Sequence, residues 1–207
     1  DVVVDSTGVI YIADRNNNRI RKVNKLGVIT TFMGTRQKEF NGDNEIAAET
    51  TLHLPFALAL QGKDNLLVVD RNHFRVRRVT LQGNKVETLA GNGKSLFRGD
   101  GGLGAGATLD APSGIAIDSH GNIYFADRLH QRVRKIVPEG IIQTVVGNGK
   151  QGSEGNRGPA SEAALHLPEV LTIDSEDNIY ITQRSGNGWL VRKVSKEGII
   201  THFAGNG

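Results

Sequence analysis

The chain has 207 residues, 38% of them hydrophobic and 23% charged, so it is long enough to bury a core and has no bias typical of disorder. Its formal charge of +3 comes from 25 Lys and Arg residues mixed with 22 acidic residues, and this balance alone does not indicate a nucleic-acid-binding protein. The absence of cysteine excludes disulfides, thiolate metal sites and a cysteine nucleophile. No apolar run approaches the roughly 20 residues of a membrane-spanning helix, so we expect a soluble chain without membrane insertion.

One pattern occurs four times along the chain. An acidic residue closes the second apolar run of each unit at Asp14, Asp70 and Asp127, and Gln183 stands at that position in the fourth unit. The steps between these positions are 56, 57 and 56 residues. A fixed period of this size is typical of propellers and solenoids. The repeats span approximately 1–34, 54–91, 111–147 and 167–205.

Each repeat contains four short runs rich in Val, Ile, Leu and aromatic residues, separated by glycine or polar turns, which predicts four strands. In the first repeat these runs are 1–5, 9–14, 19–23 and 28–32. In the second they are 58–60, 66–69, 75–79 and 86–89. The third has them within 112–128, at 132–136 and at 141–146, and the fourth at 170–173, 178–181, 190–194 and 199–203.

Long polar, glycine-rich connections separate the repeats, and at most a single helical turn is expected in them, at 45–51 and 160–165. Four antiparallel strands per unit favour an all-β fold of four-stranded blades arranged radially, with 1–207 as one domain. A parallel β-helix is the alternative, but its rungs are much shorter than this period.

The third repeat carries a family resemblance. Its segments Gly114–Asp118, Gly121–Asp127 and Arg132–Lys135, preceded by Gly99–Gly102 and followed by Val146–Gly149, resemble the NHL-repeat family of β-propellers. That family usually closes six-bladed rings, so the resemblance implies either a four-bladed ring or a four-blade arc of a larger ring. It also favours an extracellular location. The residues indicate no oligomeric state.

A first set of candidate residues consists of acidic and basic side chains five positions apart: Asp14 and Arg19, Asp70 and Arg75, Asp127 and Arg132. This spacing places a carboxylate and a guanidinium across the mouth of a hairpin, where an ion pair stabilises the turn. In the fourth repeat both members are replaced, by Gln183 and Leu190. A joint replacement favours a structural role over catalysis, because an orphaned partner would be costly.

A second set is the arginine directly after the acidic position in every repeat: Arg15, Arg71, Arg128 and Arg184. Given the propeller that the resemblance implies, these side chains form a basic arc around a channel mouth, suited to carboxylate or phosphate groups. The alternative is four solvated arginines whose aliphatic stems cover the hairpins.

A third set of candidate partner-binding residues follows the proline that opens a repeat: Phe56, Ser113, which is expected at the channel mouth, and Glu169. The amidating-lyase propellers that the fold resembles carry zinc-binding histidines there, so these residues argue against a catalytic zinc of that kind. A set of His53, His166 and Asp110 can still be drawn, but loop packing explains the histidines better. Gly99–Gly102 supplies too few oxygen ligands for calcium and no helix for a phosphate. We expect neither a metal nor a cofactor.

The fourth repeat has an enlarged hairpin, 185–189, which contains the single tryptophan, Trp189. An aromatic side chain on a loop that a rigid scaffold supports suits an interaction anchor. The alternative is that Trp189 covers the apolar edge left by the missing acidic and basic pair.

The sequence therefore favours a non-enzymatic binding or scaffold propeller that presents one loop face to a macromolecular partner, a protein in the first instance. One alternative is a lyase or hydrolase whose channel site includes Glu169 and Asp110. Another is RNA binding by the basic face, as in some members of the resembled family, against which the 5% content of aromatic residues argues.

Overall fold

The computed structural model describes residues 1–206, and its strands form one antiparallel sheet per repeat. The first sheet contains β1 (Val2–Val4), β2 (Ile10–Asp14), β3 (Arg19–Val23) and β4 (Ile29–Met33). The second contains β5 (Pro55–Gln61), β6 (Asn65–Asp70), β7 (Arg75–Thr80) and β8 (Val86–Ala90). The third contains β9 (Pro112–Ile117), β10 (Ile123–Asp127), β11 (Arg132–Ile136) and β12 (Ile142–Val146).

The fourth sheet contains β14 (Leu171–Ile173), β15 (Ile179–Ser185), β16 (Gly188–Val194) and β17 (Ile199–Ala204), with the short β13 (Gly158–Pro159) added beside β17. The predicted all-β fold with four four-stranded blades is thus confirmed. The predicted second runs coincide with β2 and β6 to within one residue, and β10 lies within the predicted 112–128, because runs rich in apolar β-branched and aromatic residues favour strands. β15 continues beyond the predicted 178–181 to Ser185.

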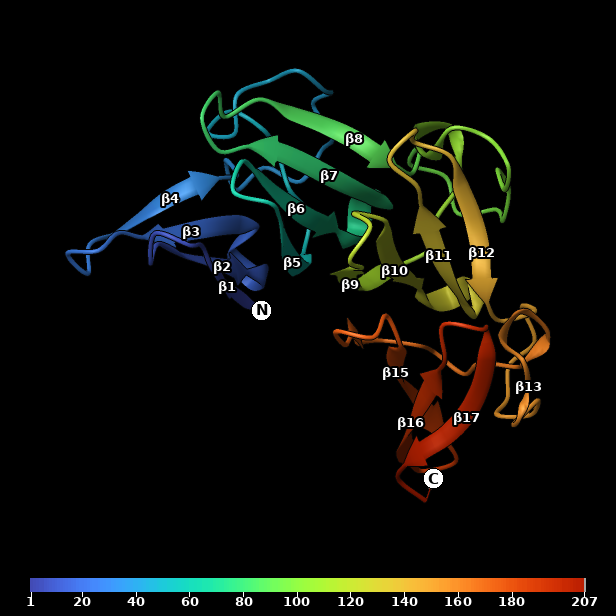
Figure 1. The fold of residues 1–207 in the computed structure, drawn as a ribbon. Coiled ribbons are helices and arrows are strands. Elements are labelled where there is room, and N and C mark those ends of the chain that lie inside the picture. Colours follow the sequence, from blue (N-terminus) through green and yellow to red (C-terminus); the bar gives the residue numbers. More distant parts are fainter. Residues whose placement is uncertain (207) are drawn as a thin grey trace.

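The four sheets follow one another around an arc, with β1, β5 and β9 toward the centre and β4, β8, β12 and β17 outside (Figure 1). The central strands contact one another in chain order, β1 with β5, β5 with β9 and β9 with β14. Within residues 1–206 the first and fourth sheets stand apart, so the arc is open and is not a closed four-bladed ring. Of the two arrangements expected, the structure shows the arc.

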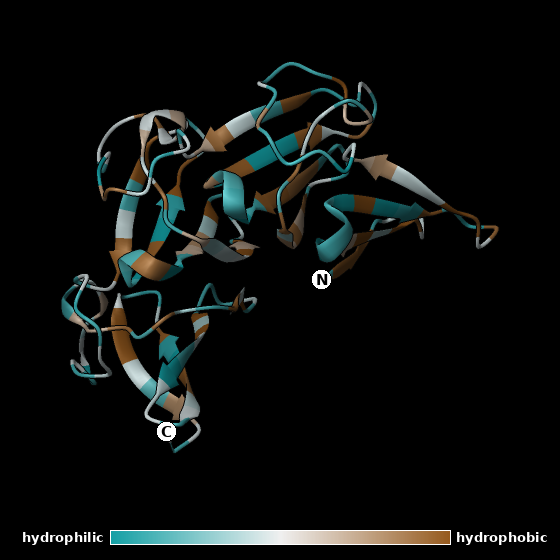
Figure 2. Ribbon diagram, turned by 180° about the vertical axis from the view of Figure 1, so that it is seen from behind, coloured by the Kyte–Doolittle hydropathy of each residue, from teal (hydrophilic) through white to brown (hydrophobic). Residues whose placement is uncertain are grey.

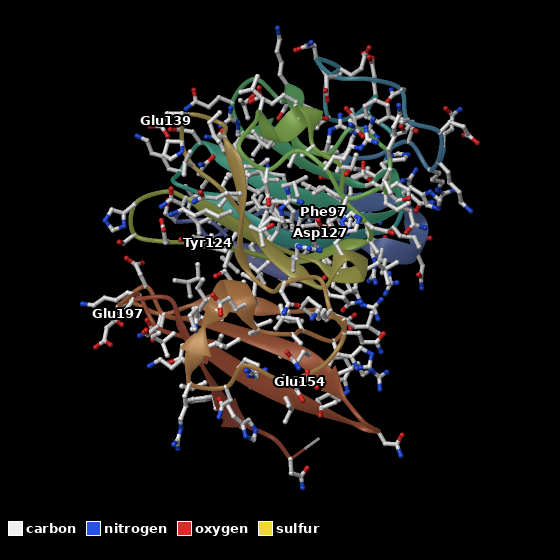
Figure 3. All side chains as sticks on the ribbon, turned by 90° about the vertical axis from the view of Figure 1, so that its right-hand side faces the viewer. Phe97, Tyr124, Asp127, Glu139, Glu154 and Glu197 are labelled. Atoms are coloured by element: carbon white, nitrogen blue, oxygen red, sulfur yellow. The ribbon has the colours of Figure 1, made fainter. Side chains whose placement is uncertain are left out.

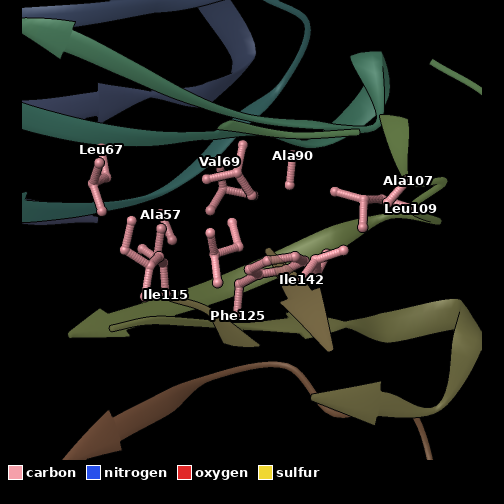
Figure 4. Packing of buried hydrophobic residues seen from close by; sticks show 12 residues of the cluster. Ala57, Leu67, Val69, Ala90, Ala107, Leu109, Ile115, Phe125 and Ile142 are labelled. Atoms are coloured by element: carbon pink, nitrogen blue, oxygen red, sulfur yellow. The ribbon is translucent and has the colours of Figure 1, made fainter. Parts of the chain in front are cut away.

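The core consists of apolar layers between successive sheets. One cluster joins the first and second sheets through residues such as Tyr11 and Leu66, and another joins the third and fourth through Tyr124 and Ile181. Between the second and third sheets, Val69 and Phe125 lie in a cluster of buried side chains (Figure 4). The second and third sheets therefore have an apolar layer on each face, whereas within residues 1–206 the first and fourth each have one neighbouring sheet. Hydrophobic segments recur on the strands along the arc (Figure 2).

The connection between two sheets runs beside the outer strand of the sheet that follows it. Ile46 pairs with Lys85, Leu103 pairs with Ile141, and β13 pairs with β17. This pairing covers outer strands that would otherwise expose free backbone groups. The expected helical turns are short: residues 47–49 form a turn, and 160–162 form one 3-10 turn, η5 (Ala160–Glu162). No helix among residues 1–206 has the length and apolar character to cross a membrane.

Candidate functional site

The turns that follow the second strand place the predicted arginines. In three sheets a 3-10 turn begins at the arginine: η1 (Arg15–Asn17), η2 (Arg71–His73) and η4 (Arg128–His130). Each turn ends in a left-handed residue with φ between 54° and 56°, which reverses the chain into the third strand. The same local geometry therefore presents the same side chain three times around the centre of the arc.

These three arginines converge on Phe56 and Glu169. The Arg71 Nη1 atom lies 3.9 Å from Glu169 Oε1, and the Arg128 Nε atom lies 3.8 Å from Glu169 Oε2. The guanidinium groups of Arg71 and Arg15 lie over the Phe56 ring, 4.5 and 5.1 Å from its centroid. We name Arg15, Arg71 and Arg128 the central arginines.

The negative charge of Glu169 does not balance the positive charges of the central arginines. Burial lowers the pKa of Arg71, and repulsion from Arg128 and Arg15 lowers it further, against the opposing effect of Glu169. The buried Nε atom of Arg128 has no hydrogen-bond partner among the described residues. Two guanidinium groups beside one carboxylate, with the Arg15 guanidinium over the same Phe56 ring as Arg71, form an electropositive centre in which a second carboxylate or another anion would be stabilised.

The fourth arginine does not join this cluster. In the fourth sheet the hairpin continues as regular strands to Ser185 and Gly188, so no 3-10 turn re-aims Arg184. Its guanidinium lies over the Trp189 ring, 4.6 Å from the centroid. The predicted arc of four arginines is therefore a cluster of three, together with one cation–π pair.

Two pockets open beside the central arginines. The first, of about 430 Å³, is lined by Asp1, Arg15, Phe56, Ala57, Leu58, Gly114, Ile115, Val170 and Leu171. The second, of about 380 Å³, is lined by Phe56, Glu169, Val170, Thr182, Trp189, Leu190 and Val191. We name the second the apolar pocket. Phe56 of β5 and Val170, which directly precedes β14, line both pockets, so the second and fourth repeats together form the wall between them.

Ser113 does not lie at the channel mouth, which corrects its expected place. Its side chain is fully buried, and its hydroxyl donates to the carbonyl oxygen of Pro168 at 3.3 Å. The cause is the close approach of β9 to β14. A Cβ on Gly114 would meet backbone atoms of Glu169, Val170 and Leu171, all within 2.8 Å. Of the three residues after the prolines, only Phe56 and Glu169 therefore reach the site.

The acidic and basic residues five positions apart stand opposite each other in neighbouring strands, but their side chains do not form ion pairs. Asp70 stands opposite Arg75 and Asp127 opposite Arg132 at the ends of the hairpins, as the spacing predicted. The Arg75 guanidinium, however, donates to the His73 carbonyl oxygen and lies 3.6 Å from the centroid of the Phe40 ring. Arg132 likewise donates to the carbonyl oxygens of His130 and Asn148.

In the first sheet Asp14 stands opposite Arg19 in the same way, and its carboxylate lies 3.9 Å from the Arg21 guanidinium. The acidic residue thus contacts the arginine seven positions later. The corresponding distances are 3.6 Å for Asp70 and Arg77 and 3.0 Å for Asp127 and Arg134. A register shift between the third and fourth strands occurs just before this arginine in every sheet.

A histidine three residues after the acid completes this buried network in two sheets. His130 Nδ1 lies 2.9 Å from Asp127 Oδ2, and His130 Nε2 lies 2.7 Å from the Ser95 carbonyl oxygen. Burial opposes the charged form, but the hydrogen bond and charge of Asp127 raise the pKa of His130 above its usual value. Phe97, which packs edge-on against the His130 ring, lies near Asp127 in Figure 3. The repeated Asp-x-x-His pattern was the signal that could have found this network.

The histidines weighed as metal ligands stay apart. His53 lies 3.4 Å from the Asn72 side chain in the second sheet, and His166 lies 2.8 Å from the Gln151 side chain near the fourth. Across residues 1–206, no three histidine or acidic side chains come together in a way that could hold a metal ion. Of the residues of the fourth sheet that line the apolar pocket, Trp189 was a predicted contact, whereas Thr182, Leu190 and Val191 were not, because only tertiary packing brings them beside Phe56.

Comparison with known proteins places this geometry in context. A family model described as the NHL repeat matches residues 1–23, and one described as the teneurin NHL domain matches residues 83–154. Teneurin-3 of Mus musculus is similar, with 30% identity over 194 residues, 84% of this chain. The chain spans 7% of the length of that curated relative.

Solved structures resemble the arc as a whole. A protein of unknown function from Bacteroides thetaiotaomicron aligns with a TM-score of 0.70 and 24% identity, over 93% of this chain and 46% of its own. Virginiamycin B lyase from Staphylococcus aureus aligns with a TM-score of 0.62 and 18% identity, over 98% of this chain and 54% of its own. Likeness at this level of identity shows the fold alone.

Proposed function

Because the chain belongs to the NHL-repeat family of β-propellers, we propose that it is a non-enzymatic binding module whose central arginines capture an acidic group on a protein partner. The observation that carries this proposal is the electropositive centre. Arg71 and Arg128 share a single carboxylate, Glu169, at distances of 3.9 and 3.8 Å, longer than hydrogen bonds. An incoming carboxylate would meet guanidinium N–H groups that make no hydrogen bond to any group of residues 1–206.

The surroundings of the arginines favour a protein over RNA as the partner. Recognition of single-stranded RNA uses exposed aromatic faces on which bases stack. The Phe56 ring lies beneath two central arginines, and the Trp189 ring lies beneath Arg184. Neither ring offers a free face toward its arginine, whereas planar guanidinium groups match the geometry of a carboxylate.

The test reverses the charge of two central arginines. Arg71→Glu combined with Arg128→Glu should weaken binding of a glutamate-rich peptide at least about 100-fold, because two charge-assisted hydrogen bonds are lost and repulsion replaces them. Fluorescence anisotropy of the labelled peptide measures the affinity, and circular dichroism checks that the variant remains folded.

The matched control is Lys25→Glu combined with Lys63→Glu. Both lysines are exposed on turns, and the double substitution changes the net charge by the same amount. Its affinity should stay within about threefold of the original chain, because charges this far from the site are screened. An equal loss of affinity in the control and the test variant would refute a specific anion site.

A further inference from the structure

The apolar pocket adjoins the central arginines through shared residues. Glu169, which lies between Arg71 and Arg128, also lines the apolar pocket. Phe56, which lies beneath Arg71, forms part of the same wall. A molecule that contacts the central arginines therefore has an apolar recess directly beside it.

The recess is an exposed apolar surface with a defined shape. Val170 keeps 53% and Trp189 keeps 44% of its surface exposed, although both line the pocket. Trp189 pairs with Arg184 across the hairpin, and its ring lies beneath that guanidinium. A rigid aromatic wall beside charged groups is typical of the centre of a binding interface.

The charges around the central arginines and the apolar pocket determine which chemical groups can occupy these two subsites at the same time. A cation in the recess would meet Glu169, but it would also meet repulsion from Arg71 and Arg128. An anionic group is favoured at the arginines and disfavoured within the recess, where Val170, Trp189 and Leu190 offer apolar surface. The complementary ligand carries a carboxylate next to a large apolar group.

We propose that this composite surface binds an extended acidic peptide segment of a partner protein, with one carboxylate on the central arginines and a neighbouring large apolar side chain in the apolar pocket. This inference rests on the proposed function, which assigns only the anion site. Side chains two positions apart in an extended chain point to the same face and lie roughly 7 Å apart along it, a spacing that suits adjacent subsites. A volume of about 380 Å³ lies in the range of ligand pockets.

The chain carries its own reporter for the recess. Trp189 is its only tryptophan, so intrinsic fluorescence reads this pocket alone. Four capped peptides test the proposal: one with glutamate and leucine two positions apart, one with the two residues adjacent, and two matched peptides in which glutamine replaces glutamate or serine replaces leucine. Each is titrated while Trp189 emission is recorded, and calorimetry gives the affinity independently.

The peptide with glutamate and leucine two positions apart should bind at least about tenfold more tightly than the matched peptide with serine in place of leucine, because burial of the leucine side chain adds to the affinity. It alone should shift the Trp189 emission to shorter wavelength. The Val170→Ser variant removes apolar surface from the recess and should reduce the preference for the leucine peptide over the serine peptide to less than about twofold. Arg71→Glu with Arg128→Glu should abolish binding of both peptides.

Equal affinities for the leucine and serine peptides, with no change in emission, would overturn this inference and leave the anion site standing. Binding of the glutamine peptide as tightly as the glutamate peptide would overturn the proposed function instead. Failure of every peptide to bind would overturn both. Trp189→Phe, followed by calorimetry, checks that the preference does not depend on the reporter itself.

Discussion

At the scale of single residues, a buried carboxylate determines how two hairpins and their neighbouring connections are held together. Asp127 is fully buried and contacts both Arg134 and His130. Arg134, also fully buried, reaches on to Asp100 at 2.7 Å in the preceding connection. The second sheet repeats this network around Asp70 and Arg77. A buried guanidinium that loses its carboxylate has no access to water, so the pair is strongly coupled to folding.

Asp127→Asn should lower the free energy of unfolding by about 3–5 kcal/mol, because it removes the buried counter-ion of Arg134, whose remaining carboxylate partner Asp100 is partly exposed, and the carboxylate that His130 contacts. The matched control is Asp14→Asn in the first sheet. Asp14 and Arg21 are 3.9 Å apart, with 25% and 28% of their side chains exposed. That exposed pair should contribute less than about 1 kcal/mol. Urea denaturation measures both, and equal losses would contradict this account.

At the scale of elements, the glycine after each outer strand allows a close contact between the two ends of a hairpin. Gly91 has a φ of 94°, and a Cβ there would collide with the carbonyl oxygen of Phe74. In the third repeat Gly147 has a φ of 93°, and an added Cβ would meet the carbonyl oxygen of Gln131 of the same repeat. The contact lets the chain leave the outer strand and return along the following blade.

Gly91→Ala and Gly121→Ala separate the cost of a positive φ from the cost of a close backbone contact. Gly121 has a φ of 82°, and within the described chain no atom lies within 4 Å of an added Cβ. Its substitution should cost about 1–2 kcal/mol through backbone strain alone. Gly91→Ala should cost at least about 2 kcal/mol more, because the clash is with backbone that cannot rotate away. Thermal unfolding of the two variants provides the comparison, and indistinguishable midpoints would refute the role of the contact.

At the scale of the whole molecule, stability is divided among the interfaces between successive sheets. Phe125 is fully buried in the layer between the second and third sheets, whereas Tyr11 lies in the layer between the first and second. Each apolar cluster joins two successive sheets around the arc, so one of these interfaces can weaken without equal loss at the others (Figure 1).

Phe125→Ala should destabilise the chain by about 3–5 kcal/mol through the cavity that it leaves. Hydrogen exchange should show the largest loss of amide protection in β6, β7, β10 and β11, and a smaller loss in β2 and β3. Tyr11→Ala is the control, with the largest loss expected in β2, β3 and β6. A uniform loss of protection in both variants would show that the arc unfolds as a single cooperative unit.

The strands were predictable because alternation of apolar and polar residues is a local signal, and its fourfold repetition at a period of 56 or 57 residues removed the ambiguity of each short run. Elements departed from prediction where backbone geometry is not local. β5 begins at Pro55 rather than Leu58, since the register shift between these residues depends on the partner strand. The pairing of β6 with β7 places Arg77 opposite Val68, on the same face as Asp70, and its guanidinium rather than that of Arg75 reaches the carboxylate.

The sequence by itself determined the repeat, the strands, the family and the recurrence of an arginine after the acidic position. Only the tertiary structure decided that Arg71 and Arg128 converge on Glu169, that Arg184 lies against Trp189 and that Ser113 is buried. The physical reason is that strand formation depends on neighbours one or two positions away. A binding site depends on side chains that lie more than 40 residues apart in the sequence, as Arg128 and Glu169 do, and their distances are set by how sheets pack.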